Sequence, residues 1–67
     1  MNNHNYFHFN GGGKIPVSSL DDIYSYCEKN QVEFDQIEIE ERDGKYLVLA
    51  LVKGSYLCIG YVDYMIN

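Results

Sequence analysis

The chain lacks the marks of a membrane or exported protein. No apolar run in its 67 residues reaches the roughly 18 residues that a membrane-spanning helix requires, because charged residues and glycine interrupt every apolar stretch. No basic segment followed by an apolar one opens the sequence, so we expect neither a secretory signal nor a transit peptide. The sequence therefore predicts a cytoplasmic protein with no membrane partner.

Basic residues are scarce as well. Five Lys and Arg stand against ten Asp and Glu, and the formal net charge is −5. Such a surface repels nucleic acid, so we expect no direct nucleic-acid binding. Six of the carboxylates and only one base lie between Glu33 and Asp43. This segment favours a basic protein as partner, with an attraction that salt weakens.

Residues with metal-binding or catalytic chemistry are few. Cys27 and Cys58 form neither a redox motif nor a metal knuckle, and we expect both to be buried free thiols. His4 and His8 have no third ligand nearby, so the sequence predicts no metal site and no cofactor. A chain this short rarely encloses a substrate pocket, so we expect no catalytic residues and no enzyme.

A glycine-rich stretch at residues 11–13 precedes Lys14 and a predicted helix. A phosphate-binding loop of the Walker type has four residues between its glycines and a Ser or Thr after its lysine, whereas Ile15 and Pro16 follow here. We therefore interpret residues 10–17 as a flexible loop. An anion site from Gly11 to Lys14 stays open as an alternative.

Apolar residues make up 46% of the chain, which predicts a real core within a single domain, residues 1–67. Residues 1–5 are expected to be disordered, and the aromatic run at residues 6–9 suits a short strand. Residues 19–30 have the i, i+3, i+4, i+7 apolar spacing of an amphipathic helix. Ser18 and Ser19 can cap this helix, and Asn30 tolerates the left-handed conformation that ends one.

Residues 35–64 predict a three-stranded antiparallel meander. Asp43 and Gly44 are the strongest short hairpin signal in the chain, because a type I′ turn needs positive φ at both central residues. Gly54 and Ser55 can make a second two-residue turn of type II′. The predicted fold is therefore α+β, with one helix packed on a small antiparallel sheet in the order β-α-β-β-β.

Counting from these two turns sorts the side chains of the meander onto two faces. The face expected to meet the helix carries Ile37, Ile39, Tyr46, Val48, Ala50, Val52, Leu57, Ile59 and Tyr61. The opposite face is expected to carry Glu38, Glu40, Leu47, Leu49, Leu51, Cys58, Val62 and Tyr64. One helix covers one face only, so the apolar part of the second face needs another cover.

Three covers are conceivable: the N-terminal aromatic segment, a second copy of the chain, or a partner. We place a homodimer first, because two-fold dimers are the commonest way in which such a face is buried. The predicted self-association or partner face is Leu47, Leu49, Leu51, Val62 and Tyr64.

The leading functional hypothesis is a small acidic protein-binding module: a phage or mobile-element inhibitor that counters a host defence by occupying a basic, nucleic-acid-binding site. Its partner-binding strip would be Asp35, Glu38, Glu40, Glu41 and Asp43. Tyr26 and Tyr56 are candidate aromatic contacts, since tyrosine is favoured at interfaces. Two alternatives stay open: a structural homodimer or assembly subunit held by the leucines, and a binder of a nucleotide-like small molecule in a dimer cleft near residues 11–14.

Overall fold

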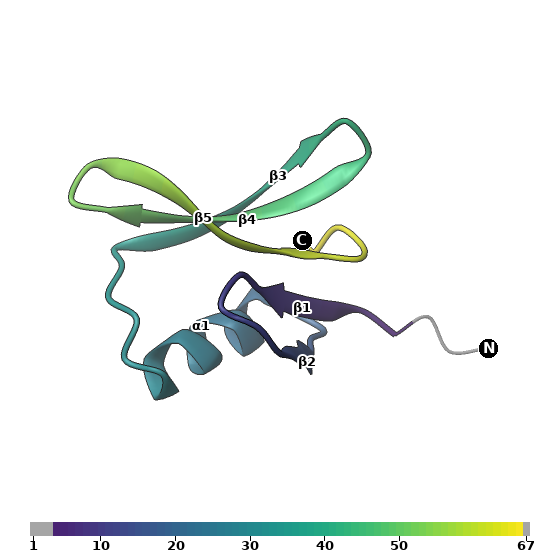
Figure 1. The fold of residues 1–67 in the computed structure, drawn as a ribbon, viewed down its shortest axis with the longest axis horizontal. Coiled ribbons are helices and arrows are strands. Elements are labelled where there is room, and N and C mark those ends of the chain that lie inside the picture. The colour runs from purple at the N-terminus through teal and green to yellow at the C-terminus, as the bar shows by residue number, and fades with distance from the viewer. Residues whose placement is uncertain (1–3, 67) are drawn as a thin grey trace.

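The computed structural model describes residues 4–66 and contains one helix and a five-stranded antiparallel sheet. The elements are β1 (Tyr6–Phe9), β2 (Lys14–Pro16), α1 (Leu20–Lys29), β3 (Gln36–Arg42), β4 (Lys45–Val52) and β5 (Ser55–Val62). The strands lie in the order β2-β1-β5-β4-β3, and α1 lies on one side of the sheet (Figure 1). The predicted α+β class and its order of elements are confirmed, with β2 as one additional short strand.

The additional strand shortens the loop predicted over residues 10–17. Lys14 pairs with His8, and Ile15 pairs with Phe7, so β1 and β2 form a hairpin. The glycines make its turn: Gly12 N–H donates to the Phe9 carbonyl at 2.9 Å, and Gly12 and Gly13 have φ of 107° and 91°. Only glycine adopts such angles readily, so these residues serve the hairpin and do not lead directly into the helix.

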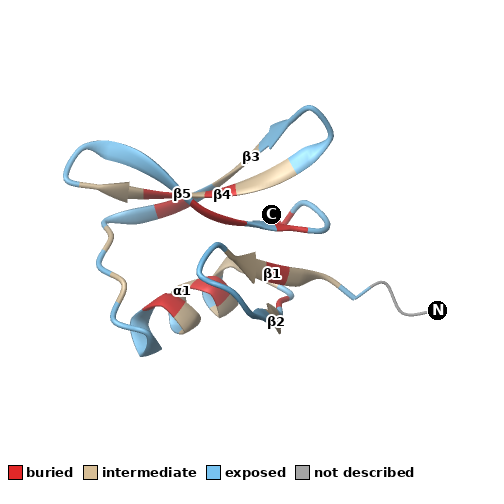
Figure 2. Ribbon diagram, in the orientation of Figure 1, coloured by how far each residue is buried: buried red, intermediate tan, exposed pale blue. Residues whose placement is uncertain are grey.

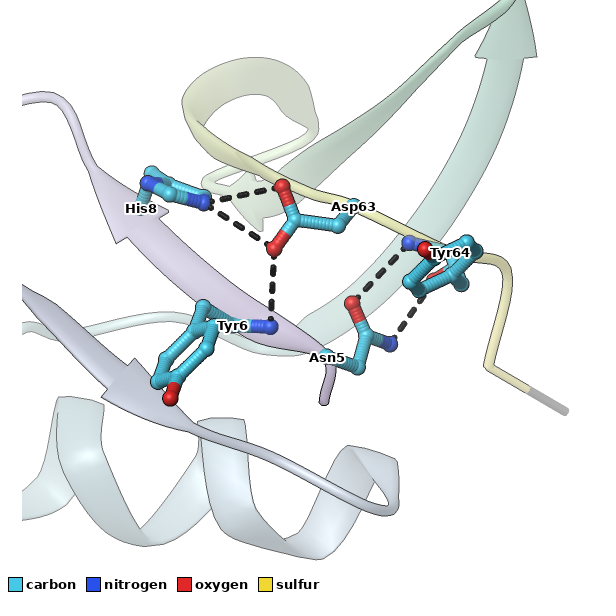
Figure 3. A network of polar contacts seen from close by, with 5 residues as sticks. All are labelled: Asn5, Tyr6, His8, Asp63 and Tyr64. Carbon is cyan, nitrogen blue, oxygen red and sulfur yellow. Dashed lines mark hydrogen bonds and ion pairs between the residues drawn. The ribbon is translucent and has the colours of Figure 1, made fainter. Parts of the chain in front are cut away.

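The N-terminal segment joins the sheet beside its central strand, β5. Residues 1–3, part of the stretch expected to be disordered, lie outside the described residues. The Asn5 side chain exchanges two hydrogen bonds with the Tyr64 backbone, each 2.9 Å long. The backbone N–H of Tyr6 donates to Asp63 at 3.1 Å (Figure 3). The chain is therefore tied to the end of β5 from Asn5 onward.

The helix begins where its capping residues predict. Ser19 is the N-cap in an extended conformation, and the Asp22 carboxylate accepts N–H groups from Ser18 at 2.7 Å and from Ser19 at 3.3 Å. These bonds, with the Ser18 backbone first, lower the pKa of Asp22. The helix has ten residues, and among residues 4–66 no helix is long and apolar enough to cross a membrane.

The helix ends at Lys29, one residue before the predicted end, and its left-handed residue lies one position later than predicted. Val32 N–H donates to the Cys27 carbonyl at 2.8 Å and Gln31 N–H to the Glu28 carbonyl at 3.2 Å, the pair of bonds that defines a Schellman motif. The left-handed residue is Gln31, with φ of 57°, and not Asn30, whose φ is −97°. Asn30 instead donates its side-chain amide to the Tyr26 carbonyl at 2.8 Å.

The core lies between α1 and the sheet, as the buried segments in Figure 2 show. It consists of Phe7, Val17, Ile23, Cys27, Ile37, Val48, Ala50, Ile59, Val62 and Ile66. The helix is also fastened to β3 by a polar contact, because Ile37 N–H donates to the Tyr24 hydroxyl at 3.0 Å. The ends of the hairpins extend beyond the helix (Figure 1), and Leu57, near the start of β5, is 59% exposed.

The first predicted turn of the meander is confirmed, and the second is wrong by one residue. Asp43 and Gly44 both have positive φ, at 53° and 79°. In the second turn the positive angles belong to Lys53 and Gly54, at 50° and 83°, while Ser55 already pairs with Val52. The second turn is thus also of type I′. Both arms of the hairpin shift by one residue together, so the residues beside the turn keep the faces that were predicted for them.

A β-bulge in β5 overturns that assignment farther along. Leu49 pairs with Cys58, but Val48 pairs with Gly60, so Ile59 is an extra residue in the ladder. One extra residue exchanges the two faces of every position that follows, because side chains alternate with a period of two. Tyr61, predicted on the helix side, therefore lies on the opposite side, and Val62, predicted on the opposite side, is 2% exposed in the core.

Gly60 is the residue that lets β1 approach β5. A Cβ atom on Gly60 would lie 2.1 Å from the His8 carbonyl oxygen and 2.8 Å from the Phe7 ring. Neither a backbone carbonyl nor a fully buried ring can move away easily, so only glycine fits here. The close approach places Phe7 opposite Val62 in the core.

Candidate functional site

The side of the sheet away from α1, called the outer face here, is a surface that no element covers among residues 4–66. Cross-strand pairing and strand alternation place on it Tyr6, His8, Lys14, Glu38, Glu40, Arg42, Lys45, Leu47, Leu49, Leu51, Tyr56, Cys58 and Tyr61, with Asp63 at its border. Tyr56 and Tyr61 are 52% and 45% exposed, and the three leucines are half-buried.

The leucine row points where the sequence predicts. Leu47, Leu49 and Leu51 alternate with the fully buried Val48 and Ala50, so their side chains lie on the face opposite the helix. The N-terminal segment is not their cover. It pairs edge to edge with β5 and widens the outer face instead of folding over it.

Two other members of the predicted self-association face lie elsewhere. Val62 belongs to the core because of the bulge at Ile59, so its assignment to a partner surface is wrong. Tyr64 lies beyond the end of β5 and is 52% exposed, with its backbone held by Asn5. In their place the outer face gains Tyr61 and the two aromatic rings of β1.

The β1 end of the outer face is organised by rings and one carboxylate (Figure 3). His8 stacks on Tyr61 with ring centroids 4.3 Å apart and planes 6° from parallel. The His8 Nε2 atom lies 3.1 Å from an Asp63 oxygen. On the neighbouring strand the Lys14 ammonium lies 4.6 Å from the centre of the Tyr6 ring. These contacts hold five side chains in defined positions on the open surface.

The predicted acidic strip does not form one surface. Glu38 and Glu40 point to the outer face, whereas Glu41 is on the other side of β3 and accepts the Gly44 N–H at 3.1 Å. Asp43 is in the turn, and Asp35 precedes β3. A strand turns successive side chains to opposite faces, so a run of acids along it is divided between them.

The two glutamates on the outer face already have donors within the chain. The Tyr56 hydroxyl donates to Glu38 at 2.6 Å, and Arg42 lies 2.7 Å from Glu40. The hydrogen bond to Glu38 raises the pKa of Tyr56, and the bond and charge of Glu40 raise the pKa of Arg42. The predicted aromatic contact Tyr56 is therefore exposed and held in place.

Charge is divided unevenly between the outer face and the rest of the chain. The outer face carries three acids and three bases: Glu38, Glu40 and Asp63, with Lys14, Arg42 and Lys45. Of ten acids and five bases, seven acids and two bases remain for the rest of the chain. The whole net charge of −5 therefore lies off the outer face.

Four of the seven acids that lie off the outer face line an open hollow of about 640 Å³, which lies between α1, the segment after it and the end of the β4–β5 hairpin. Its lining includes four carboxylates and one base: Asp21, Glu28, Glu33, Asp35 and Lys53. The rings of Tyr24 and Phe34, with centroids 5.2 Å apart, also line it. Sequence reasoning missed this site except for Asp35, because its residues come from separate elements.

Tyr26 and Cys58 differ from their predicted roles. Tyr26, a predicted partner contact, is half-buried and packs edge-on against Phe7 and Phe9, with centroids 5.7 and 5.5 Å away. Cys58, predicted to be buried, is exposed on the outer face. Cys27 is a buried free thiol as predicted, and burial raises its pKa.

The anion site left open as an alternative at Gly11 to Lys14 gains no support from the geometry, because the glycines form a hairpin turn and Lys14 lies over Tyr6. Within residues 4–66, no group of three or more His, Cys, Asp or Glu side chains could hold a metal ion. Comparison with known proteins finds no matching family model, no matching curated protein and no matching solved structure.

Proposed function

We propose that the protein is a non-catalytic protein-binding module that uses its acidic helix side to occupy a basic site on another protein. The supporting observation is the separation of charge: the outer face is neutral, and the net charge of −5 lies on the remaining surface, with four carboxylates around the hollow. A nucleic-acid-binding site has the matching chemistry, since it is basic and built to accept a row of negative charges.

The rings in the hollow favour a cationic side chain as the central contact. An Arg or Lys of the partner that entered it would meet carboxylates at the rim and the faces of Tyr24 or Phe34 within. Tyr24 and Phe34 are half-buried, and Tyr24 is also held by its bond to Ile37, so these rings would lose little freedom on binding. We therefore propose that the partner surface lies on α1 and residues 32–35 instead of along β3.

Two matched charge reversals test the proposal. Glu33→Lys at the hollow and Glu41→Lys away from it both alter exposed residues, and each changes the net charge from −5 by the same amount. The immobilised protein is expected to capture a basic protein from its source organism, with retention that falls as salt rises. Glu33→Lys should weaken that capture at least about fivefold, and Glu41→Lys should change it little.

Equal losses in both variants would mean that net charge alone drives the association. A loss confined to Glu41→Lys would return the site to β3. Either result, or the absence of any basic protein from the capture, would overturn the proposal.

A further inference from the structure

The outer face requires an explanation of its own, because the proposed function leaves it unused. It presents the half-buried leucines of β4 beside Tyr56 and Tyr61, and no element among residues 4–66 lies over it. Apolar surface of this kind marks an interface in a protein that is otherwise polar outside. Its balance of three acids and three bases means that a second neutral surface can approach without net repulsion.

One row of side chains crosses the whole sheet in register. Lys14 pairs with His8, His8 with Tyr61, Tyr61 with Leu47, and Leu47 with Glu40, one residue from each strand in the order β2-β1-β5-β4-β3. The row is positive at one end, negative at the other, and aromatic or aliphatic between. Its middle residue, Tyr61, lies on the middle strand of the sheet.

Such a row is complementary to itself when it is reversed. We propose that the outer face is the seam of a two-fold symmetric homodimer whose axis runs along the strands, close to β5. This operation lays the β3 edge of one copy over the β2 edge of the other. Lys14 then faces Glu40 of the second copy, His8 faces Leu47, and Tyr61 faces its own counterpart. Two sheets packed face to face in this way lie about 10 Å apart with nearly aligned strands.

The charges select this axis over the alternative that also packs the two outer faces together. A two-fold axis across the strands would set Glu40 against Glu40 and Lys14 against Lys14, which opposes like charges. Glu40 can take a second cation although Arg42 already lies beside it, because a carboxylate has several acceptor positions. A strongly basic partner would meet no excess of acid on this face, so the neutral outer face suits a second copy better.

The first test uses two leucines that differ in their side of the sheet. Leu47→Lys places a charge at the centre of the proposed seam, whereas Leu57→Lys places it at a 59% exposed position that pairs with Ala50 on the helix side. The wild type is expected to have the mass of a dimer in analytical ultracentrifugation at micromolar concentration. Leu47→Lys should weaken the association at least about tenfold, and Leu57→Lys should leave it unchanged. A monomeric wild type, or equal losses in both variants, would overturn the dimer.

Charge exchange tests the axis. Lys14→Glu and Glu40→Lys should each weaken the dimer, and the double variant should restore it, because the opposed pair is then merely reversed. If the axis instead ran across the strands, each single variant would still set like charges against each other and would change little. The double variant failing to recover, with its circular dichroism spectrum intact, would rule out the proposed orientation.

Chemical cross-linking tests the seam in the wild type, without a substitution that could disturb folding. Cys58 is exposed on the outer face of β5, so the axis brings the two Cys58 thiols toward each other, while Cys27 is buried. A short bismaleimide should join two chains in the wild type and not in Cys58→Ser. The absence of a cross-linked dimer would contradict the seam. The dimer and the proposed function can fail separately, because Leu47→Lys leaves the hollow intact and Glu33→Lys leaves the outer face intact.

Discussion

Both sides of the sheet carry apolar side chains, but α1 covers only one of them. On one side Val48, Ala50 and Val62 are buried under α1, together with the ring of Phe7. On the other side the leucines of β4 and the rings of Tyr56 and Tyr61 have no cover within the described residues. The excess of acids lies off the outer face, and the uncovered outer face is neutral. Hydrophobic content alone therefore does not define the core of a small domain, since the number of covering elements also limits it.

The largest loss of stability is expected from a change at Gly60, where β1 approaches β5 closely. Gly60→Ala should destabilise the fold by about 3 kcal/mol, because the new methyl group collides with the His8 carbonyl and the Phe7 ring. Both sides should suffer, since β1 supplies Phe7 to the core and Tyr6 and His8 to the outer face. Urea unfolding measures the loss, and a variant as stable as the wild type would show that β1 does not dock as described.

Val48 and Leu47 are neighbours on β4 that point to opposite sides of the sheet. Val48→Ala removes fully buried methyl groups and should cost about 2 kcal/mol, whatever the protein concentration. Leu47→Ala on the outer face should cost less than about 1 kcal/mol in dilute solution, and more at higher concentration if the dimer forms. Unfolding curves at several concentrations check this, and a concentration-dependent loss for Val48→Ala would contradict the assignment of the faces.

Asp22 is an acid on the helix side whose carboxylate already accepts hydrogen bonds within the chain. The Ser18 N–H, followed by the Ser18 hydroxyl, lowers the pKa of Asp22, so its contribution to stability is present above the ordinary Asp pKa of about 4 and is lost as the pH falls through the lowered value. Asp22→Asn should therefore lower the melting temperature near neutral pH and flatten its acid dependence. The same acid dependence in both proteins would assign that slope to other carboxylates.

The smallest effect concerns the end of α1. Gln31 has φ of 57°, an angle that costs a side-chain-bearing residue more than glycine, so Gln31→Gly should stabilise the fold by about 1 kcal/mol or less. The change adds no charge beside the hollow and should leave partner binding unaltered. A lower melting temperature would mean that the Gln31 side chain makes a stabilising contact that outweighs the strain.

Local signals in the sequence account for the parts of the fold that were predicted correctly. Ser19 and Asp22 determine the start of α1, and the apolar spacing determines which side of it is buried. Asp43 and Gly44 determine the first hairpin and hence the direction of the leucines. In each case the residues that carry the signal lie close together in the sequence.

The candidate sites were harder to predict because their residues meet across strands. The bulge at Ile59 turns Tyr61 outward and Val62 inward, and no turn count reveals it. The one available signal is Gly60, since an isolated glycine within a strand pattern often marks a bulge or a close backbone approach. The hollow likewise joins α1, residues 32–35 and the β4–β5 turn, which are distant in sequence.

The amino-acid sequence by itself determined every element except β2, the order of these elements, the net charge and the excess of apolar residues over what one helix can cover. Only the tertiary structure decided where β1 enters the sheet, which aromatic rings it adds to the open face, and how the acids divide between the two sides. The physical reason is that periodicity and capping act between neighbours, whereas a bulge, a close approach at glycine and a cross-strand row exist only after distant segments have paired.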